Sequence, residues 1–150
     1  MRLARQAAAL TLALLAAWAG GLGAGDRAEE ALRGRLRRIE AAFRQGDAAA
    51  LGGCFSGRAK VRVEFAEIPR GLYGAGQLQV IFARLFERRR TRAMSFPWAD
   101  VRIPSPETAF ARASWDHVGA RNEDERSDTL MLTLHAEEGD WRIIEMRSAR

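Results

Sequence analysis

Few side chains in this sequence are suited to acid–base chemistry, because it holds only two histidines and one tyrosine. Histidine titrates near neutral pH and can act as a general base, and a tyrosine hydroxyl can donate a hydrogen bond to a substrate oxygen. Side chains alternate between the two faces of a strand, so if Trp115 faces inward His117 does too, and Asp116 faces outward. The candidates for such chemistry are Tyr73, Asp100, Asp116, His117 and His135.

Other kinds of chemistry lack a recognisable motif. His117 and His135 fall on different predicted strands, and no cluster of His, Cys, Asp and Glu shows the spacing of metal ligands. The glycines between residues 71 and 76 lack the lysine of a phosphate-binding loop, and no serine lies in a G-x-S-x-G sequence. A single cysteine, Cys54, excludes an internal disulfide, and we expect it to be buried as a small apolar residue. The sequence therefore predicts neither a metal nor a cofactor.

Large aromatic side chains fall on elements that are predicted to surround a common interior. They either form the core or border a cavity for an apolar ligand. Three arginines on the predicted sheet, Arg112, Arg142 and Arg147, either face solvent or hold the carboxylate of such a ligand. The predicted ligand pocket comprises Phe65, Tyr73, Phe82, Phe86, Trp98, Trp115, Trp141 and Arg147.

The elements that must position these residues follow from hydrophobic periodicity. Apolar residues at spacings of three and four predict helices over 26–45, 48–52 and 77–88. Gly46 is expected to end the first helix and Asp47 to cap the second. Alternation predicts strands at 60–65, 94–103 and 108–118, and a final hairpin of 129–136 and 141–148. Prolines and glycines predict a loop over 69–76, and polar residues predict a turn over 121–128.

The first 25 residues have the composition of a secretory signal peptide. Arg2 and Arg5 precede an uncharged run that lasts to Gly25, and Ala17-Trp18-Ala19 fits the small-x-small cleavage rule. We therefore expect residues 1–25 to be a signal peptide, residues 26–150 to be one domain, and the protein to be periplasmic or secreted. The alternatives are a retained membrane anchor, since the run approaches the ~20 residues that span a bilayer, and a cytosolic helix.

The charge balance is only moderately basic. The formal net charge of +5 falls to +3 when Arg2 and Arg5 leave with the signal peptide. A basic cluster near the end of the third predicted helix fits a solvated helix end or a contact with anionic lipid, and export argues against nucleic acid as a partner. The cluster consists of Arg84, Arg88, Arg89, Arg90 and Arg92.

The order of the elements resembles the NTF2-like superfamily, whose members are also described as SnoaL-like or cystatin-like cones. The resemblance spans about residues 30–148, and it includes exported bacterial domains of unknown function. It implies an α+β fold in which three N-terminal helices pack on a strongly bent antiparallel sheet. The local sequences that carry the resemblance are Phe43-Arg44-Gln45-Gly46-Asp47, the glycine-bracketed Tyr73, Ala113-Ser114-Trp115, and Gly139-Asp140-Trp141-Arg142-Ile143-Ile144 with Arg147-Ser148.

This resemblance leaves the activity open, because the same cone hosts isomerases, dehydratases, binding proteins and assembly domains. We favour a non-catalytic binding or accessory domain that holds a small apolar or amphipathic acid, or forms a homodimer through its sheet. The alternative is a cofactor-independent lyase or isomerase, with His117 or Asp100 as the base and Tyr73 as the donor. That alternative requires these side chains to converge on one cavity. A third hypothesis, a membrane-surface protein, requires that residues 1–25 be retained.

Overall fold

The computed structural model describes residues 23–149, so the predicted signal peptide lies almost entirely outside the described residues. Among residues 23–149 no helix is both long and apolar enough to cross a membrane.

Three α-helices form at the predicted places: α1 (Ala24–Gln45), α2 (Ala48–Gly52) and α3 (Ala75–Arg88). Leu32 and Leu36 lie on the apolar stripe of α1 and are 0% and 4% exposed. Gly46 ends α1 in the left-handed conformation, at φ 65°. The carboxylate of Asp47 accepts a hydrogen bond of 2.9 Å from the Ala50 N–H at the start of α2. Both predicted capping roles are therefore confirmed.

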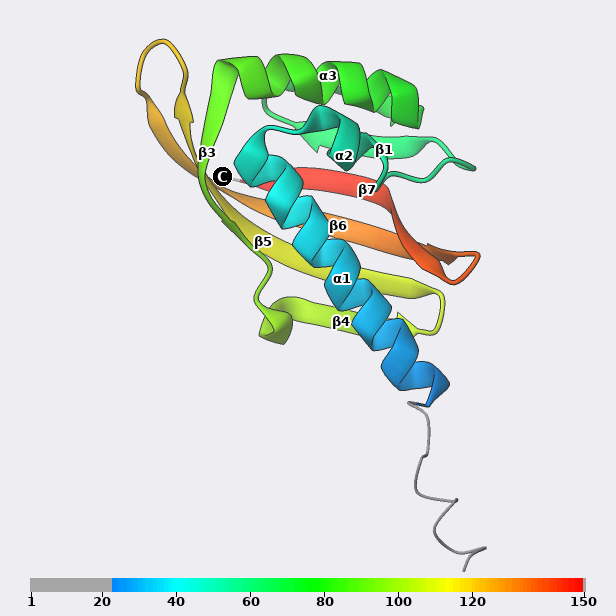
Figure 1. Cartoon of the computed structure of the whole chain (residues 1–150). Coiled ribbons are helices and arrows are strands. Elements are labelled where there is room, and N and C mark those ends of the chain that lie inside the picture. The colour runs from blue at the N-terminus through cyan, green and yellow to red at the C-terminus, as the bar shows by residue number, and fades with distance from the viewer. Residues whose placement is uncertain (1–22, 150) are drawn as a thin grey trace, which may run out of the picture.

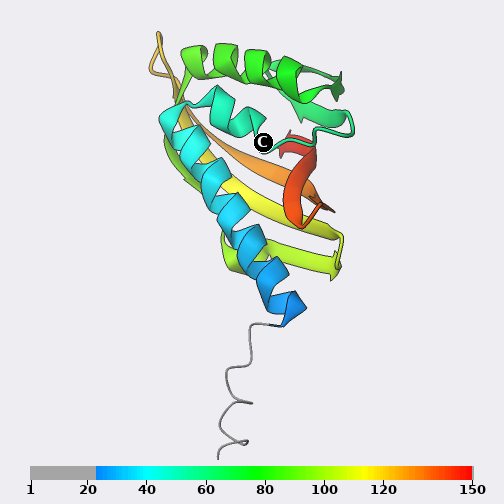
Figure 2. The ribbon, with the colours of Figure 1, turned by 45° about the vertical axis from the view of Figure 1, so that its right-hand side comes forward.

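A seven-stranded sheet curls around the three helices (Figures 1 and 2). Its order is β2–β1–β7–β6–β5–β3, and β4 pairs with the opposite end of β5 from β3. The prediction of a purely antiparallel sheet was wrong at one place, because β1 and β7 run parallel to each other. Parallel neighbours need a long connection, and the chain between these two strands, which includes the rest of the sheet, provides it. The strands are β1 (Val61–Phe65), β2 (Ile68–Tyr73), β3 (Arg89–Ser95), β4 (Val101–Ser105), β5 (Thr108–Gly119), β6 (Glu125–Glu137) and β7 (Asp140–Ala149).

The strand β2 is the largest departure from the predicted elements, since the sequence predicts a loop there. It lies at one edge of the sheet and pairs only with β1. An edge strand tolerates proline, because half of its N–H groups face solvent in any case, so Pro69 does not break it. The two residues Ala66 and Glu67 form the whole turn between β1 and β2.

Two further elements differ from the prediction. The strand β6 begins at Glu125, so the predicted polar turn over 121–128 is shorter than expected. The strand β3 begins at Arg89, directly after α3 and ahead of the predicted start at 94, so the predicted basic cluster is divided between a helix and a strand. Arg89 becomes a buried residue of β3 and is 7% exposed. The aromatic alternation also ends early, because Trp98 lies in a short 3₁₀ helix (Trp98–Asp100) after β3.

The strand β5 shows how the sheet separates an inner face from an outer face. Ala109, Ala111 and Ala113 alternate with exposed residues and point toward the helices, where each is at most 3% exposed. Figure 1 shows α1 crossing this side of the sheet diagonally. Small side chains at three successive inward positions give a helix room to lie close to the strand. Trp115 and His117 continue the same inward row toward the end of β5.

Interlocked aromatic rings fill the space between α1, α3 and the sheet. Phe82 on α3 is 0% exposed, and its ring centroid lies 5.7–6.0 Å from four other phenylalanine centroids. Most of the contacts in the cluster are edge-to-face or tilted, which is the favoured geometry for aromatic pairs. The cluster consists of Phe43, Phe55, Phe65, Phe82, Phe86 and Trp115.

A buried arginine fastens α1 to the turn between β6 and β7. Arg35 is 5% exposed and donates hydrogen bonds to the Asp140 carboxylate and to the Cys54 sulfur. Burial by itself raises the pKa of Asp140, but the hydrogen bond and the charge of Arg35 outweigh it and hold the pKa of this carboxyl below its ordinary value. The expected burial of Cys54 is confirmed, since it is 1% exposed.

The aromatic cluster gives a first prediction. We expect Phe82→Leu to lower the free energy of unfolding by about 1–3 kcal/mol, because it removes an aromatic ring from a fully packed position. Val80→Ala on the outer side of the same helix is the control, since Val80 is 53% exposed and its loss changes stability by less than about 0.5 kcal/mol. Urea unfolding of the variants measures both values, and equal effects would contradict the packing described above.

The Arg35–Asp140 pair gives a second prediction. We expect Asp140→Asn to lower the free energy of unfolding by about 1 kcal/mol at neutral pH, since the carboxylate is 40% exposed and solvent screens the pair. The folded-state pKa of Asp140 lies below its unfolded value. The contribution is therefore complete above the unfolded pKa, near pH 4, and is lost as pH falls through the folded value.

Urea unfolding at about pH 7 and at about pH 3 tests this second prediction. The difference between wild type and Asp140→Asn shrinks at the lower pH if the charge of Asp140 is responsible. Glu138→Gln is the matched control, because Glu138 lies on the same turn, pairs with Arg58 and is 77% exposed. A pH-independent loss in Asp140→Asn would mean that the charge is not what stabilises the turn.

Candidate functional site

A small recess lies at the end of the inner face where β5 ends and β6 begins. Residues of the β1–β2 turn, α3, β5, β6 and β7 line it, among them Phe65, Trp115 and His117. Its volume is about 10 Å³, which is close to the space that one water molecule needs. The recess is therefore a small unfilled space at the margin of the aromatic cluster.

His117 is the chemically distinctive residue of this recess. It is 2% exposed, and its ring stacks on Trp115 with the centroids 3.8 Å apart. Its Nε2 lies 2.9 Å from Oδ2 of Asp128, and its Nδ1 is buried without a hydrogen-bond partner among the described residues. An ionised Asp128 only accepts hydrogen bonds, so Nε2 of the neutral imidazole carries the proton and Nδ1 presents a lone pair. The arrangement leaves one basic nitrogen free beside the recess.

Four charged side chains form an ion-pair cluster beside the recess, which we call the mouth cluster, and two of them, Glu67 and Arg126, line the recess itself. They are Glu67, Arg89, Asp124 and Arg126. Glu67 accepts a hydrogen bond of 3.0 Å from Arg89 and lies 3.5 Å from Arg126. Asp124 lies 3.4 Å from Arg89 and 2.9 Å from Arg126. Each carboxylate thus contacts both guanidinium groups, and the cluster ties the β1–β2 turn to β3 and to the β5–β6 turn.

Two members of the mouth cluster, Glu67 and Arg126, line the recess and also line grooves that are open to the surface. Glu67 lines the recess and an open groove of about 590 Å³ that includes Arg89, Arg121 and Asn122. A second open groove of about 530 Å³ meets the recess at His117 and Arg126. The recess is therefore bordered by two open grooves, one at Glu67 and the other at His117 and Arg126.

The three residues predicted as an acid–base set are not brought together. Tyr73 pairs with Val61 and lies four residues, or roughly 13 Å, along β1 from Phe65 at the recess. The hydroxyl of Tyr73 donates a hydrogen bond to the Pro69 carbonyl oxygen. Of the three, only His117 lies at the recess.

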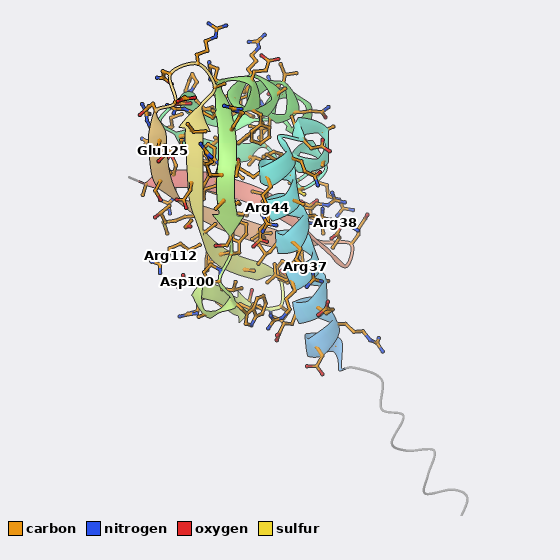
Figure 3. The ribbon with its side chains drawn as sticks, turned by 60° about the vertical axis from the view of Figure 1, so that its left-hand side comes forward. Arg37, Arg38, Arg44, Asp100, Arg112 and Glu125 are labelled. Carbon is orange, nitrogen blue, oxygen red and sulfur yellow. The ribbon has the colours of Figure 1, made fainter. Side chains whose placement is uncertain are left out.

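Asp100 lies near the far end of β5 from His117. Its carboxylate accepts a hydrogen bond of 3.0 Å from Arg112, which faces outward five residues, or roughly 17 Å, before His117. Figure 3 shows Asp100 and Arg112 near one end of the sheet and Glu125 near the other. His135 is half-buried on β6, opposite Thr108 and Arg142.

The residues predicted to line a ligand pocket are spread over several places. Phe65 and Trp115 line the recess, while Phe82 and Phe86 belong to the aromatic cluster. Trp98 lies beneath the guanidinium of Arg33, which is 3.6 Å from the ring centroid.

The other predicted pocket residues lie away from the mouth. The indole N–H of Trp141 donates a hydrogen bond of 3.0 Å to the Ala28 carbonyl oxygen on α1. Arg147 points outward and pairs with Glu145 at 2.9 Å. Arg142 donates a hydrogen bond to the Gly53 carbonyl oxygen and lies 3.2 Å from Asp140.

Sequence reasoning missed the partner of His117 and the whole mouth cluster. Asp128, Arg126 and Asp124 all fall in the segment that charge alone predicts as a turn. All residues from 121 to 128 are polar, so hydrophobic alternation gives no signal there for an early start of β6. Among residues 23–149 no three His, Cys, Asp or Glu side chains are placed to hold a metal ion together.

Comparison with known proteins identifies only the fold. No protein-family model matches the sequence, and no curated protein matches it. A ketosteroid isomerase-like protein from Erwinia carotovora is 14% identical, with a TM-score of 0.65 over 79% of this chain and 92% of that chain. A domain of unknown function with a cystatin-like fold from Nostoc punctiforme is 16% identical, with a TM-score of 0.65 over 81% of this chain and 76% of that chain.

An NTF-2 like protein of unknown function from Shewanella oneidensis is 14% identical, with a TM-score of 0.61 over 81% of this chain and 98% of that chain. Identities this low establish architecture and leave activity open. The resemblance predicted from the order of elements is confirmed at the level of the fold, with one parallel strand pair as its correction. The chain therefore has the α+β NTF2-like cone fold, with three helices packed on a curled, mixed sheet.

Proposed function

We propose that this chain is an exported, non-catalytic accessory domain that pairs with a second copy through the outer face of its sheet. The observation that carries the proposal is an exposed apolar patch near the middle of that face. Phe110 on β5 and Met131 on β6 are 46% and 44% exposed. They are diagonal neighbours, since Phe110 pairs with Thr133 two residues from Met131. Diagonal side chains of this size reach each other, so the two form one patch, which we call the outer patch.

Charged side chains of both signs surround the outer patch. Met131 lies between Arg112 on β5 and Arg147 on β7 in the register of the sheet. Arg112 pairs with Asp100, and Arg147 pairs with Glu145. A twofold interface places the same patch of two copies face to face, so a rim with both signs can form reciprocal ion pairs. The composition of the face therefore suits a second copy of this chain.

The size of the face also suits a homodimer. The strands β5, β6 and β7 contain 12, 13 and 10 residues. With their neighbour β1 they outline roughly 35 Å by 19 Å, which is on the order of 700 Å², while each partner in a standard interface buries about 800 Å². Contact over nearly the whole face would thus be needed to approach a standard interface.

The packed interior supports an accessory role over a ligand-binding role for the cone. The aromatic rings around Phe82 occupy the centre, and the remaining recess has a volume of about 10 Å³. A pocket for a drug-sized apolar or amphipathic acid needs several hundred Å³. The aromatic residues that suggested a cavity serve better as core.

A lyase or isomerase is the second candidate, and one observation favours it. His117 is oriented by Asp128, and its Nδ1 has no partner in the described part of the chain, which is how a carboxylate positions a histidine base. Tyr73 and Asp100 lie away from this nitrogen, so the described recess has no phenol to polarise a substrate oxygen. The recess also lacks room for an organic substrate, and we therefore place the non-catalytic role first.

Sheet-mediated pairing gives a third prediction. We expect the wild-type protein to elute as a dimer in size-exclusion chromatography with light scattering, and Phe110→Arg to weaken the dimer by at least about 30-fold. The introduced charge would be buried opposite its own copy, without a partner. Val80→Arg is the control, because Val80 is at least as exposed as Phe110 but lies on α3. A monomeric wild type, or equal dissociation by both variants, would rule the proposal out.

Export gives a fourth prediction, which concerns residues 1–25. We expect the intact mass of the protein from the periplasm or the medium to correspond to a chain that begins between residues 20 and 26, since small residues favour cleavage there. Cleavage after Ala19 would leave α1 whole, because that helix begins at Ala24. An intact mass that includes Met1, recovered in the membrane fraction, would instead support a retained anchor.

A further inference from the structure

His135 lies on the outer face of the sheet, at the border of the outer patch. It shares that face with Met131, since residues four apart along a strand point the same way. Its neighbour on β5 is Thr108, and two residues along these strands Thr133 lies opposite Phe110. His135 and Phe110 are therefore diagonal neighbours on the outer face. A second copy that covers Phe110 also covers His135.

The nearest charge to His135 in the register of the sheet is positive. Arg142 lies directly opposite His135 on β7. The carboxylate of Asp140 could offset that charge, but it is shared between Arg142 and the buried guanidinium of Arg35. A proton on His135 would thus place a second positive charge beside an arginine whose acidic partner is already engaged.

Two other acidic side chains lie near His135, and neither is placed to pair with it. Glu137, two residues further along β6, accepts a hydrogen bond from the hydroxyl of Ser56. Glu107, in the turn between β4 and β5, is exposed, so solvent screens its charge. The neighbours of His135 on β5 are uncharged. Among residues 23–149 the only histidine ion pair is that of His117 with Asp128.

We propose that His135 makes pairing through the outer face depend on pH: the neutral imidazole lets a second copy cover the face, and the imidazolium opposes it. This inference rests on the proposed homodimer. Histidine changes its charge between about pH 5 and pH 8, where Asp and Glu ordinarily stay ionised. Covering the face removes water from a positive charge that lies opposite Arg142 and beside an apolar ring. The dimer therefore binds protons less readily than the monomer, and its dissociation constant rises as pH falls.

Sedimentation equilibrium of the exported protein at about pH 7.5 and about pH 5.5 tests the inference. We expect the dissociation constant of the wild-type dimer to be at least about tenfold larger at the lower pH, because His135 is then protonated in the monomer. His135→Gln stays neutral, so its dimer keeps the same strength at both pH values. His135→Lys stays charged over this range, so its dimer is weak at both.

The two variants also control for the other histidine and for unfolding. His117 is 2% exposed and is unchanged in both variants, so a pH effect that arises there persists in His135→Gln. Acid unfolding of the domain would likewise dissociate that variant.

The outcomes separate this inference from the proposed function. A wild type that is monomeric at pH 7.5 overturns the proposed homodimer and the role of His135 with it. A wild-type dimer of equal strength at both pH values overturns the role of His135 alone. So does a His135→Gln dimer that weakens at low pH as much as the wild type.

Discussion

Interlocking of aromatic rings around Phe82 is the constraint on which the rest of this structure depends. The ring lies among phenylalanines contributed by α1, the segment after α2, β1 and α3 itself. Because each ring fills the gap that its neighbours leave, the helices are held against the concave face of the curled sheet (Figure 2). The same packing removes the space in which a cone fold would hold a large ligand.

Polar groups are concentrated at the margin of this core, and their arrangement follows from burial. Arg35 and Arg89 are both buried, and each is neutralised by carboxylates from turns that are distant in the sequence. Such pairs add little stability over apolar packing, but breaking one leaves a charge stranded. They fix the β6–β7 turn at one end of the sheet and the β5–β6 turn at the other. His117 differs from them, because one of its nitrogens has no hydrogen-bond partner within residues 23–149.

The sequence predicts the helices and most of the strands, because their hydrophobic periodicities are strong. Gly46 and Asp47 also predict the boundary between α1 and α2, since glycine favours a helix end and aspartate favours a helix start. It fails at β2, where edge pairing tolerates a proline and glycines that local rules assign to a loop. It also places His117 on the inward face but cannot find Asp128, Glu67 or Arg126. Their contacts join segments far apart in the chain, and charge alone resembles a solvated turn. The sequence assigns the aromatic residues to the interior, but only their packing in the folded chain decides whether they form a core or border a cavity.

The central claim is that the aromatic interior is closed to apolar ligands. The indole N–H of Trp115, which donates a hydrogen bond of 2.9 Å to Thr91 inside the domain, provides a direct probe. Nuclear magnetic resonance of this group during titration with a medium-chain fatty acid makes the measurement. A filled core predicts that the Trp115 resonance stays in place up to saturating ligand. A saturable shift of that resonance would show a cavity that opens around Trp115 and would contradict the account.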